Sequence, residues 1–263
     1  MSSLARLALS SLARAPARAA IRLLALAAAA ALVGAMVLFI GHAQRTMTGL
    51  AVRSVPLDWQ GPVGSAHAAA RVAAEVAQQP GVVQASPVAT APFTGVEHQA
   101  PVGAIAAGAG SLLAVPPGYL AHLRTFRFLR GTLRDGEIVL DQQLAATLQA
   151  QPGDTVTLAL APGSRRSFRV SGVAAVTAGD TLFQPLDPLL GPAPAQPPAN
   201  VAILPLATFR RLAAGGGLEG ARWQVQAQVD PGALGGSPSH AFASATRLRN
   251  RVERSLQIGR AHV

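Results

Sequence analysis

The side chains best suited to chemistry in this chain of 263 residues are six histidines and twelve acidic residues, since cysteine is absent. Two close pairs are candidates: Glu97 with His98, and Asp135 with Glu137. Adjacent residues of a strand face opposite sides of a sheet, so Glu97 and His98 are poorly placed to share one ligand. Asp135 and Glu137 could form an acid–base pair on one face, but two acids that flank Gly136 are more typical of a solvated turn.

Motifs of the common enzyme classes are absent from the sequence. It contains no GxxxxGK[ST] phosphate loop, no HExxH zinc motif and no GxSxG nucleophile elbow, and the glycines at 103, 108 and 110 do not form a GxGxxG fingerprint. None of the histidines has a second ligand at metal-binding spacing; they are His42, His67, His98, His122, His240 and His262. Without cysteine there is no disulfide, thiolate–metal site or thiol nucleophile. We therefore predict that the chain is not an enzyme and has no catalytic residue, cofactor or metal site.

The positive charge of the chain lies at its two ends. The formal net charge is +10, and all 22 basic residues are arginine. Residues 1–22 and 241–263 each contribute +4, whereas residues 42–240 contribute only +2. A protein that binds nucleic acid usually carries its positive patch on the folded body, with aromatic side chains for single strands. The charge distribution therefore argues against a nucleic-acid partner.

Residues 23–41 predict a membrane-spanning helix, because this run of 19 residues has no charged side chain. A helix of that length spans about 28 Å, close to the hydrocarbon thickness of a bilayer. The arginines before it place residues 1–22 in the cytoplasm by the positive-inside rule; they are Arg6, Arg14, Arg18 and Arg22. The alternative is a signal peptide cleaved at residues 41–43. We favour the uncleaved span, because the run exceeds the ~7–15 residues of a signal-peptide core.

Residues 42–256 alternate between helical and extended patterns. Ser65 can cap a helix over residues 65–79, which Pro80 and Gly81 would end. Alternation of apolar and polar residues predicts strands over 155–160, 167–173 and 223–229, the last of them half exposed. The other predicted elements are extended segments at 82–88 and 95–107, a short helix at 119–123, a strand at 137–140, a helix at 141–149, a strand at 201–204, a helix at 205–213, and a helix from Ser237 or Ser239 to about Leu256.

The clearest block is residues 137–176, which reads as strand, helix, strand, strand. Asp141 can cap its helix, and a turn at Gly153 and Asp154 sets the pairing of the two strands that follow. An antiparallel hairpin beside a helix indicates the α+β class. We therefore predict an α+β fold with one N-terminal transmembrane helix, followed by a mixed α+β extracytoplasmic domain with antiparallel hairpins.

The same block resembles the extracytoplasmic core of ABC-transporter permeases of the FtsX/MacB type, whose pattern is E-[IV]-V-L-x-x-x-L-A-x-x-L followed by G-D-x-V-x-L. The matching positions are Glu137, Ile138, Val139, Leu140, Leu144, Ala145, Leu148, Gly153, Asp154, Val156 and Leu158. AEVAQQPGVVQASPV and VAILPLATFRRL agree with the family, as does the basic start before the first apolar helix. The resemblance implies an outer domain that binds a partner or cargo, or transmits motion, while a separate ATPase hydrolyses ATP.

The chain departs from that family at its end. Permeases of this type carry further transmembrane helices after the outer domain, whereas this sequence has one apolar span and stops at Val263. Residues 258–263 (IGRAHV) match the translated start of a widely used sequencing adapter. We therefore expect these residues to be adapter-derived and the domain at residues 42–256 to be part of a longer gene product. An authentic stop codon after Val263 in genomic DNA would contradict this expectation.

Two functions remain open from the sequence. The first is a membrane-anchored fragment of an ABC permease subunit, which couples its outer domain to a separate ATPase for transport or mechanotransmission. Its implied partners are the ABC ATPase subunit, the remaining permease helices and the lipid bilayer, and a permease dimer is compatible with it. It would lie in the plasma membrane with the main domain outside. The second is a signal-anchored or secreted interaction domain without transport activity.

Overall fold

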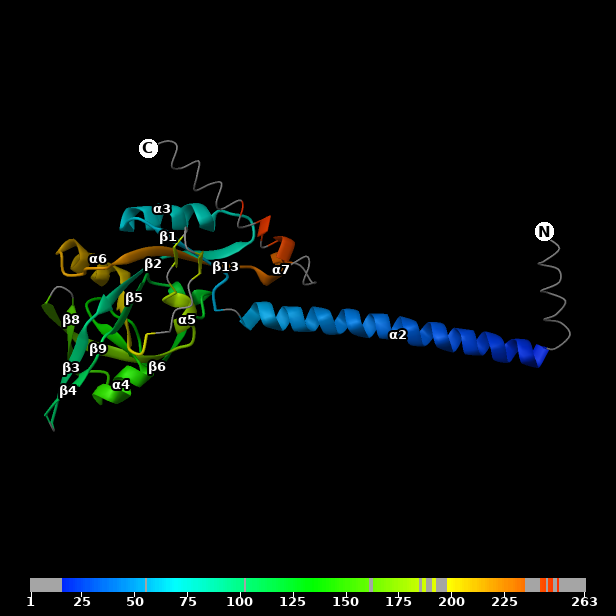
Figure 1. The fold of residues 1–263 in the computed structure, drawn as a ribbon, viewed down its shortest axis with the longest axis horizontal. Helices are drawn as coiled ribbons and strands as arrows, with labels where there is room; N and C mark the ends of the chain where they lie inside the picture. Colours follow the sequence, from blue (N-terminus) through cyan, green and yellow to red (C-terminus); the bar gives the residue numbers. More distant parts are fainter. Residues whose placement is uncertain are drawn as a thin grey trace.

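A computed structural model describes residues 16–54, 56–101, 103–160, 163–184, 186–187, 191–192, 198–234, 242–244, 246–247 and 250. It consists of one long helix, α2 (Pro16–Ser54), and a sheet-rich domain from which that helix projects (Figure 1). Pro16 suits the first turn of a helix, where no backbone N–H is needed. Within α2, Leu24–Ala43 is long and apolar enough to cross a membrane, with a mean hydropathy of 2.5. Its side chains are exposed, so no protein packing accounts for their apolar character.

The domain is built on one large mixed sheet. Its strand order is β1-β13-β2-β5-β12-β7-β9-β8-β3-β4, and β6 pairs with β9 outside this path. Neighbours are antiparallel except for β5 with β12 and β7 with β9, which are parallel. The strands are β1 (Trp59–Val63), β2 (Val82–Phe93), β3 (Gly95–Ala100), β4 (Gly103–Ala107), β5 (Gly110–Val115), β6 (Phe126–Gly131), β7 (Ile138–Asp141), β8 (Thr155–Leu160), β9 (Ser164–Val176), β12 (Val201–Pro205) and β13 (Arg222–Val229), with β10 (Leu186–Asp187) and β11 (Gly191–Pro192) as a separate pair.

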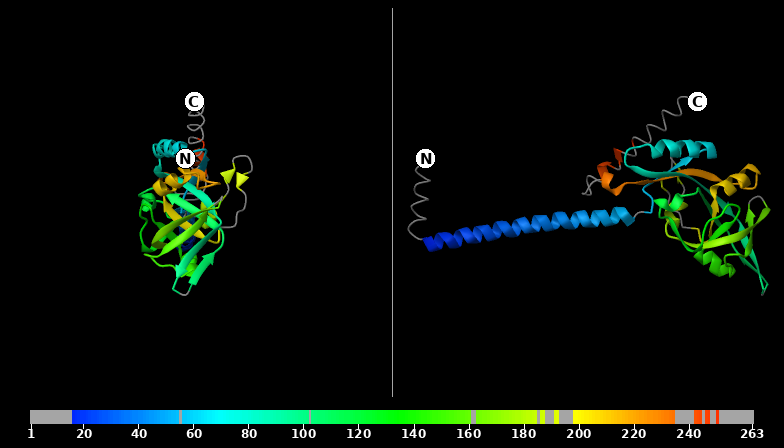
Figure 2. Two further views of the ribbon diagram at one scale, coloured as in Figure 1. Left: turned by 90° about the vertical axis from the view of Figure 1, so that its left-hand side faces the viewer. Right: turned by 180° about the vertical axis from the view of Figure 1, so that it is seen from behind.

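Short helices pack around the sheet, as Figures 1 and 2 show. They are α3 (Ala66–Ala77), the 3-10 turn η1 (Tyr119–Ala121), α4 (Gln142–Leu148), α5 (Gly179–Leu182), α6 (Leu206–Ala214) and α7 (Pro231–Leu234). The caps expected at two of them are present: the Ser65 hydroxyl accepts from Ala68 N at 3.1 Å, and the Asp141 carboxylate accepts from Gln143 N at 3.1 Å. Each cap satisfies a backbone donor that the first helical turn leaves free.

The long strand β9 belongs to two parts of the sheet, and the main core lies between these parts. Its first half, residues 164–169, pairs with β8, and its second half pairs with β7 and β6. The expected hairpin is therefore confirmed, and the alternating Val156, Leu158 and Leu160 are all buried. The core between the two parts of the sheet also contains residues of α4 and α6, among them Leu144, Leu148 and Phe209.

A second apolar cluster lies between α3 and the strands β1, β13 and β2. Ala69, Val72, Ala73 and Val76 form the buried side of α3, at the i, i+3, i+4, i+7 spacing of an amphipathic helix. They pack against Val225, Ala227 and Val229 of β13.

The prediction that residues 223–229 form a half-exposed strand is wrong in its exposure. β13 lies between β1 and β2, and its other face is covered by Tyr119 and by residues near α5. Gln224 and Gln226 are therefore buried, at 7% and 0% exposure. Pro205 was expected in the first turn of a helix over residues 205–213. In the structure it is the last residue of β12 and precedes α6.

Several expectations fall outside the described residues. These include the arginines at positions 6 and 14, most of the C-terminal helix expected over 237–256, and residues 258–263. The described residues 242–244, 246–247 and 250 are helical.

Candidate functional site

His98 and Glu97 lie on opposite faces of β3, as their adjacency predicts. The buried His98 ring places Nδ1 2.9 Å from the carbonyl oxygen of Leu148 and Nε2 3.7 Å from Oδ2 of Asp154. Glu97 points outward, with Oε2 3.4 Å from Nη1 of Arg165. His98 thus connects the end of α4 to the β3–β4 hairpin. Asp154 lies in the turn before β8. Among the described residues, no group of three or more His, Asp or Glu could hold a metal ion.

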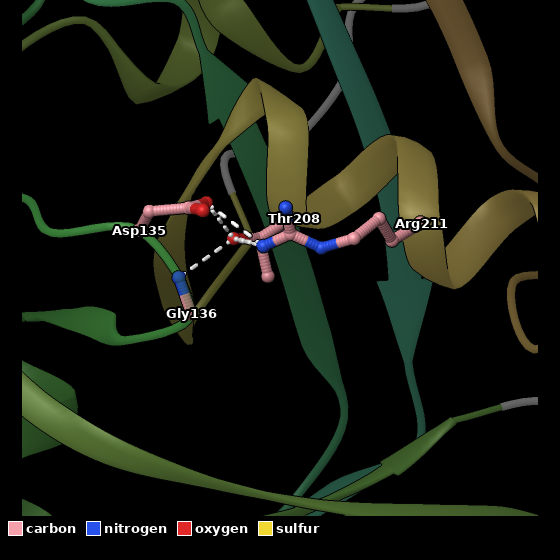
Figure 3. Close-up of polar contacts among 4 residues, drawn as sticks. All are labelled: Asp135, Gly136, Thr208 and Arg211. Carbon is pink, nitrogen blue, oxygen red and sulfur yellow. Dashed lines mark hydrogen bonds and ion pairs between the residues drawn. The ribbon is translucent and has the colours of Figure 1, made fainter.

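Asp135 belongs to a polar cluster with Thr208 and Arg211 of α6, whereas Glu137 takes no part in it (Figure 3). Oδ1 of Asp135 accepts from Thr208 Oγ1 at 2.7 Å and from Arg211 Nη2 at 2.9 Å. Thr208 Oγ1 accepts in turn from Gly136 N at 2.9 Å. The hydrogen bond from Arg211, followed by that from Thr208, lowers the pKa of the Asp135 carboxyl below its ordinary value of 3.8. A carboxylate held ionised in this way fastens the turn before β7 to α6.

A largely apolar groove of about 620 Å³ lies beside this cluster. Its walls come from the turn after β5, from β6, and from the junction of β12 and α6. The ring of Phe128 packs edge-on against Phe126 at 5.7 Å between centroids, and Phe126 stacks on Tyr119. Asp135 and Thr132 supply polar groups at the lining. The groove is therefore an apolar hollow with a few polar groups at its lining.

Asp58, which the sequence did not single out, holds the segment between α2 and β1 against β13. Residues 56–58 connect α2 to β1, and here we call them the α2–β1 junction. Asp58 N donates to Ala227 O at 3.1 Å, and the Asp58 carboxylate accepts from Val229 N at 2.8 Å and from the Gln228 side chain. Burial raises the pKa of this carboxyl above 3.8, although both hydrogen bonds oppose the rise. Asp58 thus binds the start of β1 to the end of β13.

Both ends of the described domain meet at this junction. β1 and β13 are antiparallel neighbours from the Trp59–Ala227 pair to the Val63–Trp223 pair. After β13 the chain passes through Asp230, whose N–H donates to Gly81 O at 2.8 Å, into α7. Figures 1 and 2 show α7 and the end of α2 on the same side of the domain. The segment that arrives from the apolar helix and the segment that leaves the domain are therefore hydrogen-bonded neighbours.

Glutamines form a buried polar layer on the face of β1 and β13 that points away from α3. Gln226 Oε1 accepts from the Tyr119 hydroxyl, which accepts from Thr125 Oγ1 at 3.0 Å. Gln224 Nε2 donates to Leu182 O at 3.4 Å, and Gln60 Nε2 donates to Thr181 O at 2.9 Å. Burial raises the pKa of the Tyr119 hydroxyl far above its ordinary range, so it remains a neutral donor. The layer thus links the strands beside the junction to η1 and α5.

Three solved structures are similar to this chain at low sequence identity. The periplasmic region of MacB from Actinobacillus actinomycetemcomitans aligns at 17% identity over 70% of this chain and 73% of that chain, with a TM-score of 0.41. A domain of a putative permease protein from Porphyromonas gingivalis aligns at 16% identity over 67% and 68%, with a TM-score of 0.40. The extracellular domain of the noncanonic ABC-type transporter YknZ from Gram-positive bacteria aligns at 14% identity over 73% and 91%, with a TM-score of 0.42.

A search of curated protein sequences found no match. The model of the MacB-like periplasmic core domain matches residues 19–235, which is well over half of the chain. The chain therefore belongs to the MacB-like periplasmic core domain family.

Proposed function

We propose that this chain is the membrane-anchored outer part of an ABC permease subunit and that it transmits motion between its membrane helix and its extracytoplasmic domain. ATP hydrolysis belongs to a separate ATPase subunit, and this chain has no catalytic role. In this arrangement residues 1–22 lie in the cytoplasm, the apolar part of α2 (Leu24–Ala43) crosses the plasma membrane, and the sheet-rich domain lies outside.

The pairing of β1 with β13 is the observation that carries this proposal. In this proposal a displacement of α2 reaches β13 through the α2–β1 junction, because Asp58 is hydrogen-bonded to both Ala227 and Val229. The buried glutamines pass such a displacement on to η1 and α5. Three of their polar atoms have no hydrogen-bond partner among the described residues: Gln60 Oε1, Gln226 Nε2 and Gln228 Oε1. An unpaired buried polar atom costs about 1–3 kcal/mol, so a rearrangement that gives these atoms protein or water partners would recover part of that cost.

The membrane span is tested by the paired substitutions Leu32→Arg and Gly34→Arg in the full chain. Both positions lie within the apolar part of α2, and an arginine near the centre of a span costs about 2.5–3.5 kcal/mol on insertion scales. We expect the protein to move from the membrane fraction to the soluble fraction, as measured by fractionation and immunoblotting. A Leu32→Ile, Gly34→Ala control should remain in the membrane. Retention of the arginine variant would show that α2 is not the anchor.

The topology can be measured directly because the chain has no cysteine of its own. A cysteine in place of the exposed Ala70 on α3 should react with a membrane-impermeant maleimide in intact cells. A cysteine in place of Ser3 should react only after the cells are opened. The reverse labelling pattern would overturn the proposed orientation.

Coupling to an ATPase is tested in two steps. The reading frame that follows in the genomic locus is added to the chain, and the tagged product is then purified. We expect further apolar spans in that frame and an ATP-binding subunit in the purified complex. The second candidate function is an interaction domain without transport, which the apolar groove beside Asp135 favours. It predicts no further span and no co-purifying ATPase, so the two functions give opposite results.

A further inference from the structure

The three edges of the sheet are protected very differently. β1 contains Pro62, which lacks a backbone donor, and the β10 segment lies against this strand. β6 carries Arg127 and Arg130 and has an irregular register between Phe128 and Arg130. Proline, charged side chains and bulges are the devices by which natural edge strands avoid pairing with other chains.

The third edge, β4, has none of these devices. Its five residues are Gly, Ala, Ile, Ala and Ala, and it pairs in regular register with β3 from Ala100–Gly103 to Val96–Ala107. Among the described residues, no strand pairs with its other side. Because alternate residues of an antiparallel strand direct their N–H and C=O groups away from the partner, β4 presents free backbone groups along an uncharged edge.

We propose that β4 pairs antiparallel with β4 of a second copy of this chain, about a two-fold axis at Ile105. This register sets Ile105 opposite Ile105 of the second copy and Ala104 opposite Ala106. Two copies of an uncharged strand can pair without placing like charges opposite each other. Two copies of a charged edge such as β6 cannot. Ile105 is half-buried on the side of His98 and α4, so the two isoleucines extend the apolar side of the sheet.

The orientation of the hairpin suits two chains anchored in one membrane. Antiparallel neighbouring strands are related by a two-fold axis perpendicular to the sheet. In the left view of Figure 2, which looks along the length of α2, the β3–β4 hairpin is seen broad side on. Figure 1 shows the same hairpin nearly edge on. The two-fold axis therefore runs roughly along α2, so that both helices can enter the bilayer from the same side.

The small size of the interface decides where pairing occurs. Two five-residue strands bury far less than the roughly 1,000 Å² of a stable interface. Dissolved chains should therefore remain monomeric at low concentration. Anchoring in one bilayer raises the effective concentration of the second copy, and in this respect the inference rests on the proposed membrane anchor.

Single cysteines report this register without background, because the chain contains none. Full chains with Ala104→Cys and Ala106→Cys, differently tagged, are co-expressed, and the isolated membranes are oxidised. Opposite Cβ atoms lie about 4.5–5.5 Å apart and diagonal ones about 7–8 Å apart, and a disulfide needs the shorter distance. We expect the mixed dimer to exceed either self-dimer by about fivefold or more, and Ile105→Cys to cross-link with itself.

Ala70→Cys on the exposed side of α3 is the matched control. A mixed yield no higher than that of this control would overturn the proposal, and so would cross-linking of the β4 cysteines to a different protein. Fractionation of the same cells measures the membrane anchor separately. If the chain proves soluble, the anchor is wrong, and oxidation of the purified variants at about millimolar concentration tests the pairing itself by the same mixed-to-self ratio.

Discussion

Two aspartates fasten distant parts of this domain by opposite physical means. Asp135 is exposed and is held ionised by Arg211 and Thr208, so the pKa of its carboxyl is lowered. Asp58 is about half buried and accepts from Val229 N and the Gln228 side chain, yet burial raises the pKa of its carboxyl. An exposed ion pair is screened by water and contributes little, whereas loss of a buried acceptor leaves its donors unsatisfied. The comparison therefore assigns the greater structural role to the α2–β1 junction.

Removal of the buried carboxylate should have the largest effect. Asp58→Ala leaves Val229 N and the Gln228 amide without their acceptor, so we expect a loss of about 1–3 kcal/mol in the free energy of unfolding. Urea titration of the detergent-solubilised chain measures this loss. Asp58→Asn keeps an oxygen acceptor and should lose less. A loss for Asp58→Ala no larger than that for Asp135→Ala would remove the distinction between the two sites.

The glutamine layer beside the junction should show coupling between its members. Tyr119→Phe leaves Gln226 Oε1 and Thr125 Oγ1 without their partner, and we expect it to cost about 1–2 kcal/mol. Gln226→Leu should cost less in the Tyr119→Phe background than in the native chain, because the shared hydrogen bond is lost only once. A double-mutant cycle measured by urea unfolding gives this difference. Strict additivity would mean that the two side chains do not act together.

The opposite pKa shifts predict opposite dependences of stability on pH. For Asp58, the folded chain binds more protons than the unfolded chain between pH 3.8 and the raised pKa, so its contribution falls as pH rises through that window. For Asp135, the stabilising contribution is present above pH 3.8 and is lost as pH falls from 3.8 through the lowered pKa.

These signs can be read from unfolding free energies of the native chain, Asp58→Asn and Asp135→Asn between about pH 3 and about pH 7. The advantage of the native chain over Asp135→Asn should grow as pH rises, and its advantage over Asp58→Asn should shrink. The same sign for both variants would contradict the contrast between the two environments.

The exposed cluster should give the smallest effect. Arg211→Ala removes the ion pair with Asp135 and the hydrogen bond from Arg211 to Thr208, but leaves the hydrogen bonds that join Thr208 to Asp135 and Gly136 in place. We expect a small decrease in the melting temperature at low salt that disappears at about 1 M NaCl, where the screening length is about 3 Å. Thermal unfolding followed by circular dichroism measures both conditions. A decrease that persists in high salt would indicate that Arg211 acts through packing.

Local patterns in the sequence identified most of the elements of this fold. Ser65 and Asp141 lie at the helix starts that they were expected to cap, and the period-two pattern at residues 155–160 places its apolar side chains in the core. These features depend on residues a few positions apart, which is why sequence reasoning finds them. The resemblance to the family also rests on such a local motif. Two of its residues, Gly153 and Asp154, lie in the turn before β8.

The features that sequence reasoning missed depend on distant partners. The alternation of Gln with apolar residues in β13 is the usual pattern of a half-exposed strand, and only the position of Tyr119 shows that Gln226 is buried. Asp58 belongs to no motif of the sequence. Asp135 was noted beside Glu137, but its true partners on α6 lie 73 and 76 residues further along the chain. No spacing rule connects residues so far apart.

The contact between Asp58 and Val229 also sets the order in which this protein can be made. These two residues are 171 positions apart, so β1 waits for nearly the full length of the domain to be synthesised before it gains its neighbour. Until β13 arrives, β2 also lacks its partner on that side. A ribosome stalled before codon 222 would therefore leave the apolar helix joined to a domain in which β1 and β2 lack their shared neighbour. The strand that joins β1 to β2 is therefore also the strand that holds the segment after the apolar helix.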